Sequence, residues 1–316
     1  MLRLLALILA TVAAQAAETR IAVIPKGTTH EFWKSIHTGA RAAAAELTAA
    51  GTPVSIVWKG PLKEDDRAGQ IEVVETLAAS GVAGIVLAPL DDRALVAPVE
   101  AAVQAGLPVV VIDSALRSER IRSFVATDNR EGGRTAGRHL AGLLGGKGQV
   151  LMLRYMEGSA STLEREAGFL EAMQAFPEIT LVSQDQYAGP TRDTALTASQ
   201  NLLTRFGSRI QGVFTPNESS TAGMNLALVQ EGLTSVRHVG FDASPALVDA
   251  LRAGTLHGTV VQDPQRMGYL GVKHCVAAVR GETVAAKVDT PVRLVTPTNL
   301  TEPEIRALIA PPAEGR

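Results

Sequence analysis

Short apolar runs alternate with longer amphipathic segments along most of the chain. The runs at 21–24, 84–88 and 108–112 have no polar position, whereas the segment 66–80 places Ile71, Val74 and Leu77 at helical spacing. Uninterrupted apolar strands are typical of a parallel sheet that helices cover on both faces. The pattern therefore predicts an α/β protein with parallel sheets.

This alternation forms two series, one ending near residue 112 and a second beginning after 124–129. The second series has expected strands at 149–154, 179–184, 211–215, 236–241 and 257–262. A helix at 265–279, a strand at 292–295 and a short helix at 303–309 follow. The two series share a pattern but no repeated sequence, and 316 residues are enough for two domains. We expect two doubly wound lobes.

The segment 21–39 contains the first candidate for a binding function. A strand ends at Pro25, and after a Gly/Thr turn the first helical turn carries His30, Phe32 and Trp33. This turn lies at the carboxyl edge of the sheet, where open α/β sheets bind ligands. Adjacent aromatic residues point about 100° apart on a helix, so at most one of them packs fully inward. Ordinary packing of both against the sheet is the alternative.

Polar side chains follow the predicted strands. Carboxylates and amides bind vicinal hydroxyls, and an aromatic face covers the apolar side of a sugar ring. Together with the aromatic residues, the set predicts a carbohydrate or polyol site, while turn and N-cap roles are the alternative for each residue alone. The positions are Lys26, Lys59, Asp113, Ser114, Thr127, Asp128, Asn129, Asn217, Glu218, Asp242 and Gln262, with Ala88 after the third strand.

Composition narrows the choice of partner. The formal net charge of -2 gives no electrostatic basis for binding nucleic acid or an anionic membrane. Aromatic residues make up 4% of the chain, so the grouping of Phe32, Trp33 and Trp58 near two strand ends is a concentration.

The first 16 residues have the features of a secretory signal peptide. Arg3 precedes a short apolar run, and Ala14-Gln15-Ala16 has the form of a cleavage site. Cys275 is the single cysteine of the sequence, so no lipidation cysteine follows that site and no intramolecular disulfide can form. We expect a periplasmic protein that begins near residue 17, with a disordered tail at 311–316.

Six motifs in order resemble a known family. They are IAVIP at 21–25, FVATDN at 124–129, GSASTLEREAGF at 158–169, GVFTPNESS at 212–220, VGFDASP at 239–245 and GTVVQDPQRMG at 258–268. Over nearly all of the mature chain they resemble the type I periplasmic sugar-binding proteins of the ribose-binding type. The resemblance implies two lobes joined by three crossovers, with the first lobe formed by 17–126 plus 263–291 and the second by 127–262 plus 292–310. Ligand closes these lobes on a hinge.

The resemblance also assigns ligand-binding roles. It implies that His30, Phe32, Trp33 and Asp113 bind from the first lobe, with the aromatic rings stacked on the sugar. Ligand contacts from the second lobe and the hinge would come from Asn217, Asp242 and Gln262. Thr127, Trp58 and Arg165 are secondary candidates, and Arg165 is expected mainly to brace the loop 159–162.

Three positions depart from the ribose-binding pattern. Ala88 replaces the usual Asn, Ser114 replaces an Arg, and Leu163 replaces the first Arg of the helix motif. Ribose therefore loses much of its usual hydrogen bonding. Lys26, the break at 60–61, the run 69–72 and the pair 113–114 are similar to autoinducer-2 and rhamnose-binding members, which implies that Lys26 contacts ligand; a solvated loop lysine is the alternative.

Other functions lack their sequence signals. No GxGxxG motif follows a strand, and no P-loop, nucleophile-base signature or metal-ligand spacing is present. A signal peptide occupies the place where a repressor would carry its helix-turn-helix. We expect a monomer without catalytic activity, cofactor or metal that captures a small neutral polyhydroxylated ligand for an ABC-type permease. A sensor that reports to a sensor kinase or chemoreceptor is the alternative.

Overall fold

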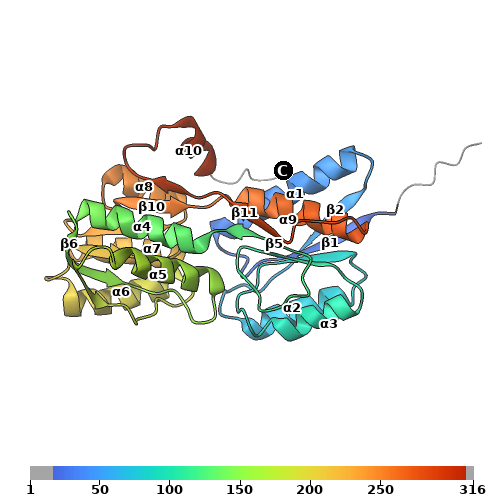
Figure 1. Ribbon diagram of the computed structural model, residues 1–316, viewed down its shortest axis with the longest axis horizontal. Helices are drawn as coiled ribbons and strands as arrows, with labels where there is room; N and C mark the ends of the chain where they lie inside the picture. Colours follow the sequence, from blue (N-terminus) through green and yellow to red (C-terminus); the bar gives the residue numbers. More distant parts are fainter. Residues whose placement is uncertain (1–16, 311–316) are drawn as a thin grey trace, which may run out of the picture.

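The computed structural model describes residues 17–310, which form two lobes around two six-stranded sheets (Figure 1). The predicted signal peptide and tail lie at 1–16 and 311–316, outside the described residues. Within the described part of the chain, no helix is long and apolar enough to cross a membrane.

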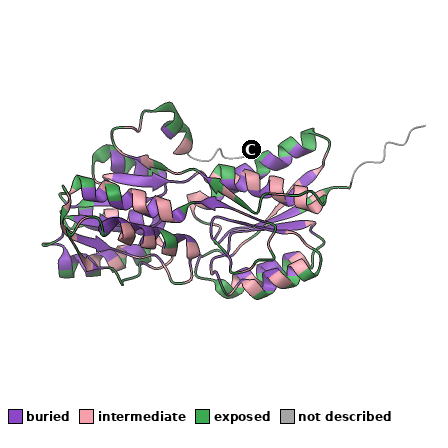
Figure 2. Ribbon diagram, in the orientation of Figure 1, coloured by how far each residue is buried: buried purple, intermediate pink, exposed green. Residues whose placement is uncertain are grey.

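The sheet of the first lobe has the strand order β11-β5-β4-β3-β1-β2, and all of its pairs are parallel. Its strands are β1 (Thr19–Ile24), β2 (Val54–Trp58), β3 (Gly84–Leu87), β4 (Val109–Ile112), β5 (Ser123–Thr127) and β11 (Lys287–Thr290). Helices α1 (Glu31–Ala49) and α9 (Pro264–Val279) cover one face, and α2 (Arg67–Ala78) and α3 (Val96–Gln104) cover the other. The central strands β3 and β4 are wholly buried (Figure 2), which explains their continuous apolar sequence.

The second lobe repeats this design with the strand order β12-β10-β9-β8-β6-β7. Its strands are β6 (Lys147–Met152), β7 (Glu178–Ser183), β8 (Gly212–Phe214), β9 (Arg237–Phe241), β10 (Gly258–Val261) and β12 (Arg293–Val295). One face is covered by α4 (Asn129–Leu143) and α5 (Ala160–Met173), the other by α6 (Arg192–Phe206) and α7 (Glu218–Gln230). Helices α8 (Pro245–Ala253) and α10 (Pro303–Leu308) enclose a smaller core beside β10 and β12.

Strands β11 and β12, each at one edge of its sheet, differ from the sequence prediction. β11 was not expected, because its sequence KVDT lacks an apolar run and only its last residue is buried. β12 was expected in a parallel sheet but pairs antiparallel with β10, because the chain enters it directly from β11 without a crossover helix. The remaining expected strands and helices form, with ends that move by a few residues.

Glycines allow two helix pairs to pack with backbones almost in contact. A Cβ added at Gly39 in α1 would lie 1.9 Å from the carbonyl oxygen of Gln265, and one at Gly268 in α9 would lie 2.0 Å from that of Ile36. The pair α4 and α5 packs in the same way at Gly133 and Gly168. Each lobe therefore has one helix pair held at a fixed, short separation, and α5 carries part of the site described next.

The chain passes between the lobes three times, after β5, after β10 and between β11 and β12. The carboxyl ends of the parallel strands in both lobes face the junction, so the loops that follow these strands meet there (Figure 1).

Candidate functional site

A cavity lies between the closed lobes. Eight residues selected from the sequence line it, together with Arg165: Lys26, His30, Phe32, Trp33, Asp113, Asn217, Asp242 and Gln262. Six further residues complete the wall: Glu64, Tyr155, Ser159, Ser161, Thr162 and Glu218.

Lys26 and Asp113 form a buried ion pair on the first-lobe wall. The Lys26 Nζ lies 2.9 Å from Asp113 Oδ2 and also donates a hydrogen bond of 3.1 Å to Ser161 Oγ of the second lobe. The backbone N–H of Ser161 in turn donates to Ser114 Oγ at 3.1 Å. Lys26 is 4% exposed, so the solvated loop lysine considered from the sequence is not what the structure shows.

Glu64 is the centre of a second polar cluster that also spans the lobes. Its Oε1 accepts hydrogen bonds from Trp33 Nε1 at 2.8 Å and from His30 Nδ1 at 3.0 Å. Its Oε2 accepts from the Tyr155 hydroxyl of the second lobe at 2.7 Å. The ring of Trp33 meets Phe32 edge to face, with centroids 5.0 Å apart.

These contacts shift the pKa values of the cluster. Burial raises the pKa of Glu64, but the hydrogen bond and charge of His30, together with the charge of Lys26 and the hydrogen bond of Trp33, outweigh it and bring the pKa down to about 2. Burial lowers the pKa of His30, yet the hydrogen bond and charge of Glu64 leave it above its usual value. Burial together with the charge of Glu64 raises the pKa of Tyr155. Glu64 is therefore ionised and Tyr155 keeps its proton.

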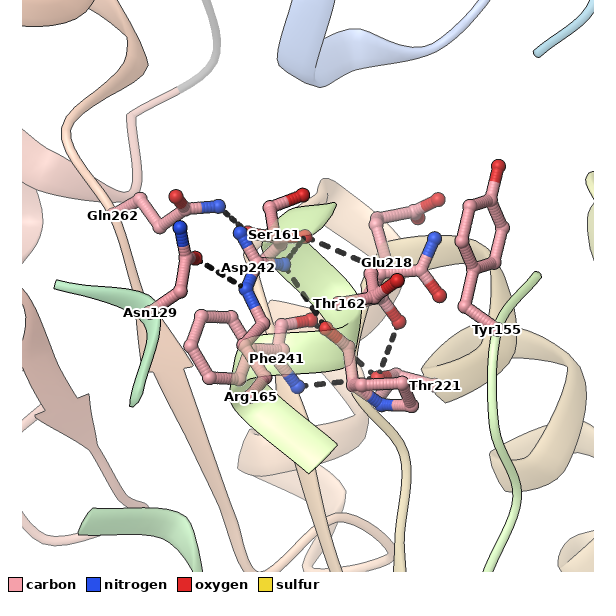
Figure 3. A network of polar contacts seen from close by, with 12 residues as sticks. Asn129, Tyr155, Ser161, Thr162, Arg165, Glu218, Thr221, Phe241, Asp242 and Gln262 are labelled. Atoms are coloured by element: carbon pink, nitrogen blue, oxygen red, sulfur yellow. Dashed lines mark hydrogen bonds and ion pairs between the residues drawn. The ribbon is translucent and has the colours of Figure 1, made fainter. Parts of the chain in front are cut away.

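Arg165 is the central cation of the second-lobe wall (Figure 3). Its Nε donates to Asn129 Oδ1 at 2.8 Å, its Nη1 donates to the carbonyl oxygen of Pro216 at 2.9 Å, and its guanidinium lies over the ring of Phe241. The sequence prediction that Arg165 braces the loop 159–162 is wrong. Its second-turn position in α5 directs the side chain into the cavity wall, across to α4 and the end of β8.

Asp242 lies beside this arginine, 3.7 Å from Nη1. Its Oδ1 accepts from Gln262 Nε2 at 2.6 Å, and its Oδ2 accepts from the backbone N–H of Glu218 at the start of α7 at 3.1 Å. Burial raises the pKa of Asp242, although Arg165 and Gln262 oppose this shift. Gln262 Oε1 is buried and has no hydrogen-bond partner among the described residues.

Asn217 and Glu218 begin α7. Asn217 caps the helix, its side chain accepting from the backbone N–H of Ser220, so the cap role considered from the sequence is real and coexists with a place on the cavity wall. Glu218 forms an ion pair with Arg192 from α6.

Two secondary candidates are not at the cavity. Trp58 ends β2, an edge strand, and its ring stacks on His37 with centroids 4.5 Å apart. Thr127 is buried beside Thr290 of β11, with their hydroxyl oxygens 3.4 Å apart. Both residues lie at the carboxyl end of a strand, as the other candidates do. Their neighbours His37 and Thr290 do not line the cavity.

Sequence reasoning left several wall residues unassigned. Glu64 lies in the charged run Lys63-Glu64-Asp65-Asp66, which resembles a solvated loop. Tyr155, Ser159, Ser161 and Thr162 follow β6, whose end was expected two residues later, at 154. Glu218 was noted at a strand end but not selected. The missed residues lie just after β6, the first strand of the second series, where the same rule of polar residues at strand ends applies.

The described residues contain no group of three or more His, Cys, Asp or Glu side chains arranged to hold a metal ion. Cys275 is fully buried in the first-lobe core, and burial raises its pKa to about 12.

Two similar α/β lobes that enclose a cavity lined with charged, polar and aromatic side chains define a bilobal solute-binding protein. The chain matches the family model described as "Periplasmic binding protein domain" over residues 21–283. The protein belongs to this family of periplasmic binding proteins and is of the ribose-binding type.

Individual relatives agree with this assignment. The ribose import binding protein RbsB of Escherichia coli is 31% identical over 287 residues, 90% of this chain and 94% of that protein. A carbohydrate transporter solute-binding protein of Agrobacterium radiobacter, solved with D-arabinose, is 36% identical with a TM-score of 0.87, covering 93% of this chain and 99% of that one. An ABC transporter solute-binding protein of Agrobacterium vitis, solved with D-fucose, is 32% identical with a TM-score of 0.86, covering 92% and 99%.

Proposed function

We propose that this protein captures a monosaccharide or a similar small polyhydroxylated ligand in the periplasm and presents it to an ABC-type permease. One observation carries the proposal: eight residues selected from the sequence for sugar binding, five from the first lobe and three from the second lobe and hinge, line a single cavity between the lobes.

The charges of the wall favour a neutral ligand. Each carboxylate has a basic side chain near it: Lys26 for Asp113, His30 for Glu64, Arg192 for Glu218 and Arg165 for Asp242. A charged ligand would bring into the site a charge for which no unpaired partner remains among these groups, which costs free energy. Hydroxyl groups donate to the carboxylates and accept from the cations without that cost.

The wall differs from a ribose site in ways that define the ligand class further. Ser114 stands where a ribose binder has an Arg, and its hydroxyl is engaged with the second lobe through Ser161. Lys26 supplies the cation beside Asp113 instead. Because solved relatives hold D-arabinose and D-fucose, we propose pentoses and 6-deoxyhexoses as the first ligands, with autoinducer-2 as a further probe.

Closure of the lobes is the proposed binding step. Contacts across the cleft include Lys26 to Ser161, Glu64 to Tyr155, and the Asp92 N–H donating to the carbonyl oxygen of Gly158 at 3.1 Å. A ligand that contacts both walls binds the closed state more tightly than the open state and so shifts the equilibrium toward closure. The relatives named above are binding proteins, which supports binding without catalysis.

The test is a thermal-shift screen of residues 17–316 against pentoses, hexoses, 6-deoxyhexoses, polyols, nucleosides and autoinducer-2, followed by calorimetry. A ligand that binds only the folded state raises the melting temperature by mass action. A rise of several degrees with one sugar supports the proposal. No response, together with no ligand detected by native mass spectrometry, would contradict it.

A further inference from the structure

Glu64 differs from the other carboxylates of the cavity in what it binds. Each of its three hydrogen-bond donors, the side chains of His30, Trp33 and Tyr155, itself lines the cavity. A buried carboxylate with three directional donors fixes the orientation of all three side chains. Glu64 thus orients three side chains of the cavity wall through its contacts with them.

For His30, this contact decides which groups a ligand meets. Since Nδ1 donates to Glu64, Nε2 is an acceptor when the ring is neutral and a donor when the ring is protonated. The charged groups that act on the ring are Glu64, Glu218 and Arg192; both carboxylates favour protonation and the arginine opposes it. The balance, against the effect of burial, raises the pKa of His30. Nε2 therefore carries a hydrogen at higher pH than in an ordinary histidine.

The contact with Glu64 has the opposite effect on Tyr155, because it leaves an acceptor for the ligand and not a donor. Its hydroxyl hydrogen is directed at Glu64 Oε2, 2.7 Å away, so the lone pairs of the phenol oxygen remain to accept from a ligand hydroxyl. Tyr155 belongs to the second lobe and Glu64 to the first. This acceptor is consequently fixed in place when the lobes are closed.

We propose that Glu64 is a positioning residue that sets the polarity of the wall: it favours the protonated form of His30, in which Nε2 is a donor, and makes the Tyr155 oxygen an acceptor toward the ligand. The wall then selects a ligand that offers a hydroxyl donor at Tyr155 and an acceptor oxygen to the protonated His30. The ligand selection rests on the proposed function, whereas the state of His30 does not.

The state of His30 is tested in the ligand-free protein by ¹⁵N NMR titration of the histidine side chains, with H30Q used to identify its signal. We expect the pKa of His30 to be lower in E64Q than in the wild type. E46Q, which changes an exposed glutamate bound to Tyr269 and Lys273, is the matched control and should leave the titration unchanged. The same His30 titration in the wild type and E64Q would overturn the proposal.

The effect on recognition is tested with D-arabinose and D-fucose as probes. We expect E64Q to weaken binding of the sugar that the wild type binds by at least about tenfold and to move the pH dependence of binding toward lower pH. Y155F leaves Glu64 intact and should weaken binding about tenfold, whereas Y187F, at an exposed tyrosine on the same lobe, should not. Equal affinities of Y155F and Y187F would overturn the role of Tyr155. Failure of the wild type to bind either sugar would count against the proposed function, while the ligand-free titration would still decide the role of Glu64.

Discussion

Asp113 and Asp242 occupy equivalent places in the two lobes and share an unusual backbone conformation. Each follows the fourth strand of its lobe, β4 or β9, with φ of 62° and 68°. The backbone N–H of Asp113 donates to the carbonyl oxygen of Val125 in β5, and the backbone N–H of Asp242 donates to the carbonyl oxygen of Val260 in β10. No other non-glycine residue of 17–310 has positive φ. Strained backbone of this kind concentrates at functional sites, and here both strained residues place their carboxylates on the wall of the same cavity.

Replacing Asp242 separates the role of its charge from that of its backbone. D242A should weaken ligand binding by at least about tenfold, because charge-assisted hydrogen bonds to hydroxyls are lost. It should also unfold more easily than D242N by about 1–2 kcal/mol, since asparagine tolerates the left-handed region and alanine does not. Calorimetry and urea titration measure the two effects. If D242A and D113A both bound ligand like the wild type, the site assignment would be wrong.

The Lys26–Asp113 pair should behave as a buried ion pair. K26M is expected to lose about 3–5 kcal/mol of stability, because it leaves the Asp113 carboxylate unpaired in the interior. The double variant K26M/D113N should recover much of that stability but not the affinity. W58F is the control for the binding assay, because Trp58 lies outside the cavity, and its affinity should equal that of the wild type. A stable K26M protein with normal affinity would contradict the prediction.

The close packing of α4 and α5 should control the position of Arg165. A Cβ at Gly168 would lie 2.0 Å from the carbonyl oxygen of Arg130, so G168A forces the helices apart and should lower both stability and affinity. Gly142, in α4, has no atom within 4 Å of an added Cβ. G142A should therefore stabilise the protein by up to about 1 kcal/mol and leave binding unchanged. Thermal unfolding and calorimetry of the two variants provide the comparison, and equal behaviour would refute it.

His238 should make the protein acid-sensitive. It is fully buried on β9 with Nε2 2.9 Å from Thr215 Oγ1, and burial, with a smaller effect of His257, lowers its pKa to about 3. Between the unfolded value of about 6.5 and that value, the unfolded state binds more protons, so the free energy of unfolding falls as the pH falls, by up to about 1.4 kcal/mol per pH unit. Above pH 6.5 this contribution is constant. Urea titrations from pH 7 to 4.5 should show a shallower decline for H238L, and parallel curves for both proteins would exclude this cause.

The sequence predicted the part of the site that depends on parallel-sheet geometry. Lys26, Asp113, Asp242 and Gln262 all follow strands whose carboxyl ends meet at the junction, so their proximity follows from the fold class. The same rule failed for Trp58, because it says nothing about a strand's place in its sheet and β2 lies at the edge.

The remainder of the site depends on lobe closure, which local sequence does not encode. Glu64 looks like a solvated charge until Tyr155, distant in the sequence, is brought to 2.7 Å from it. Arg165 could be placed on a helix, but its partners Asn129 and Pro216 come from separate segments. Strand β11 was missed for a related reason: it is polar and exposed, and pairing with β5 alone makes it a strand.

The three passages of the chain between the lobes also determine when each lobe can be completed during synthesis. Val272, Cys275 and Val276 of α9 lie in the core of the first lobe, and β11 extends its sheet, yet both elements are made after β6 to β10 of the second lobe. A nascent chain that has emerged only as far as β10 still lacks α9, one of the two helices that cover one face of the first sheet. Neither lobe can thus be cut out as one continuous fragment, and the exposed core persists until the last part of the chain has been made.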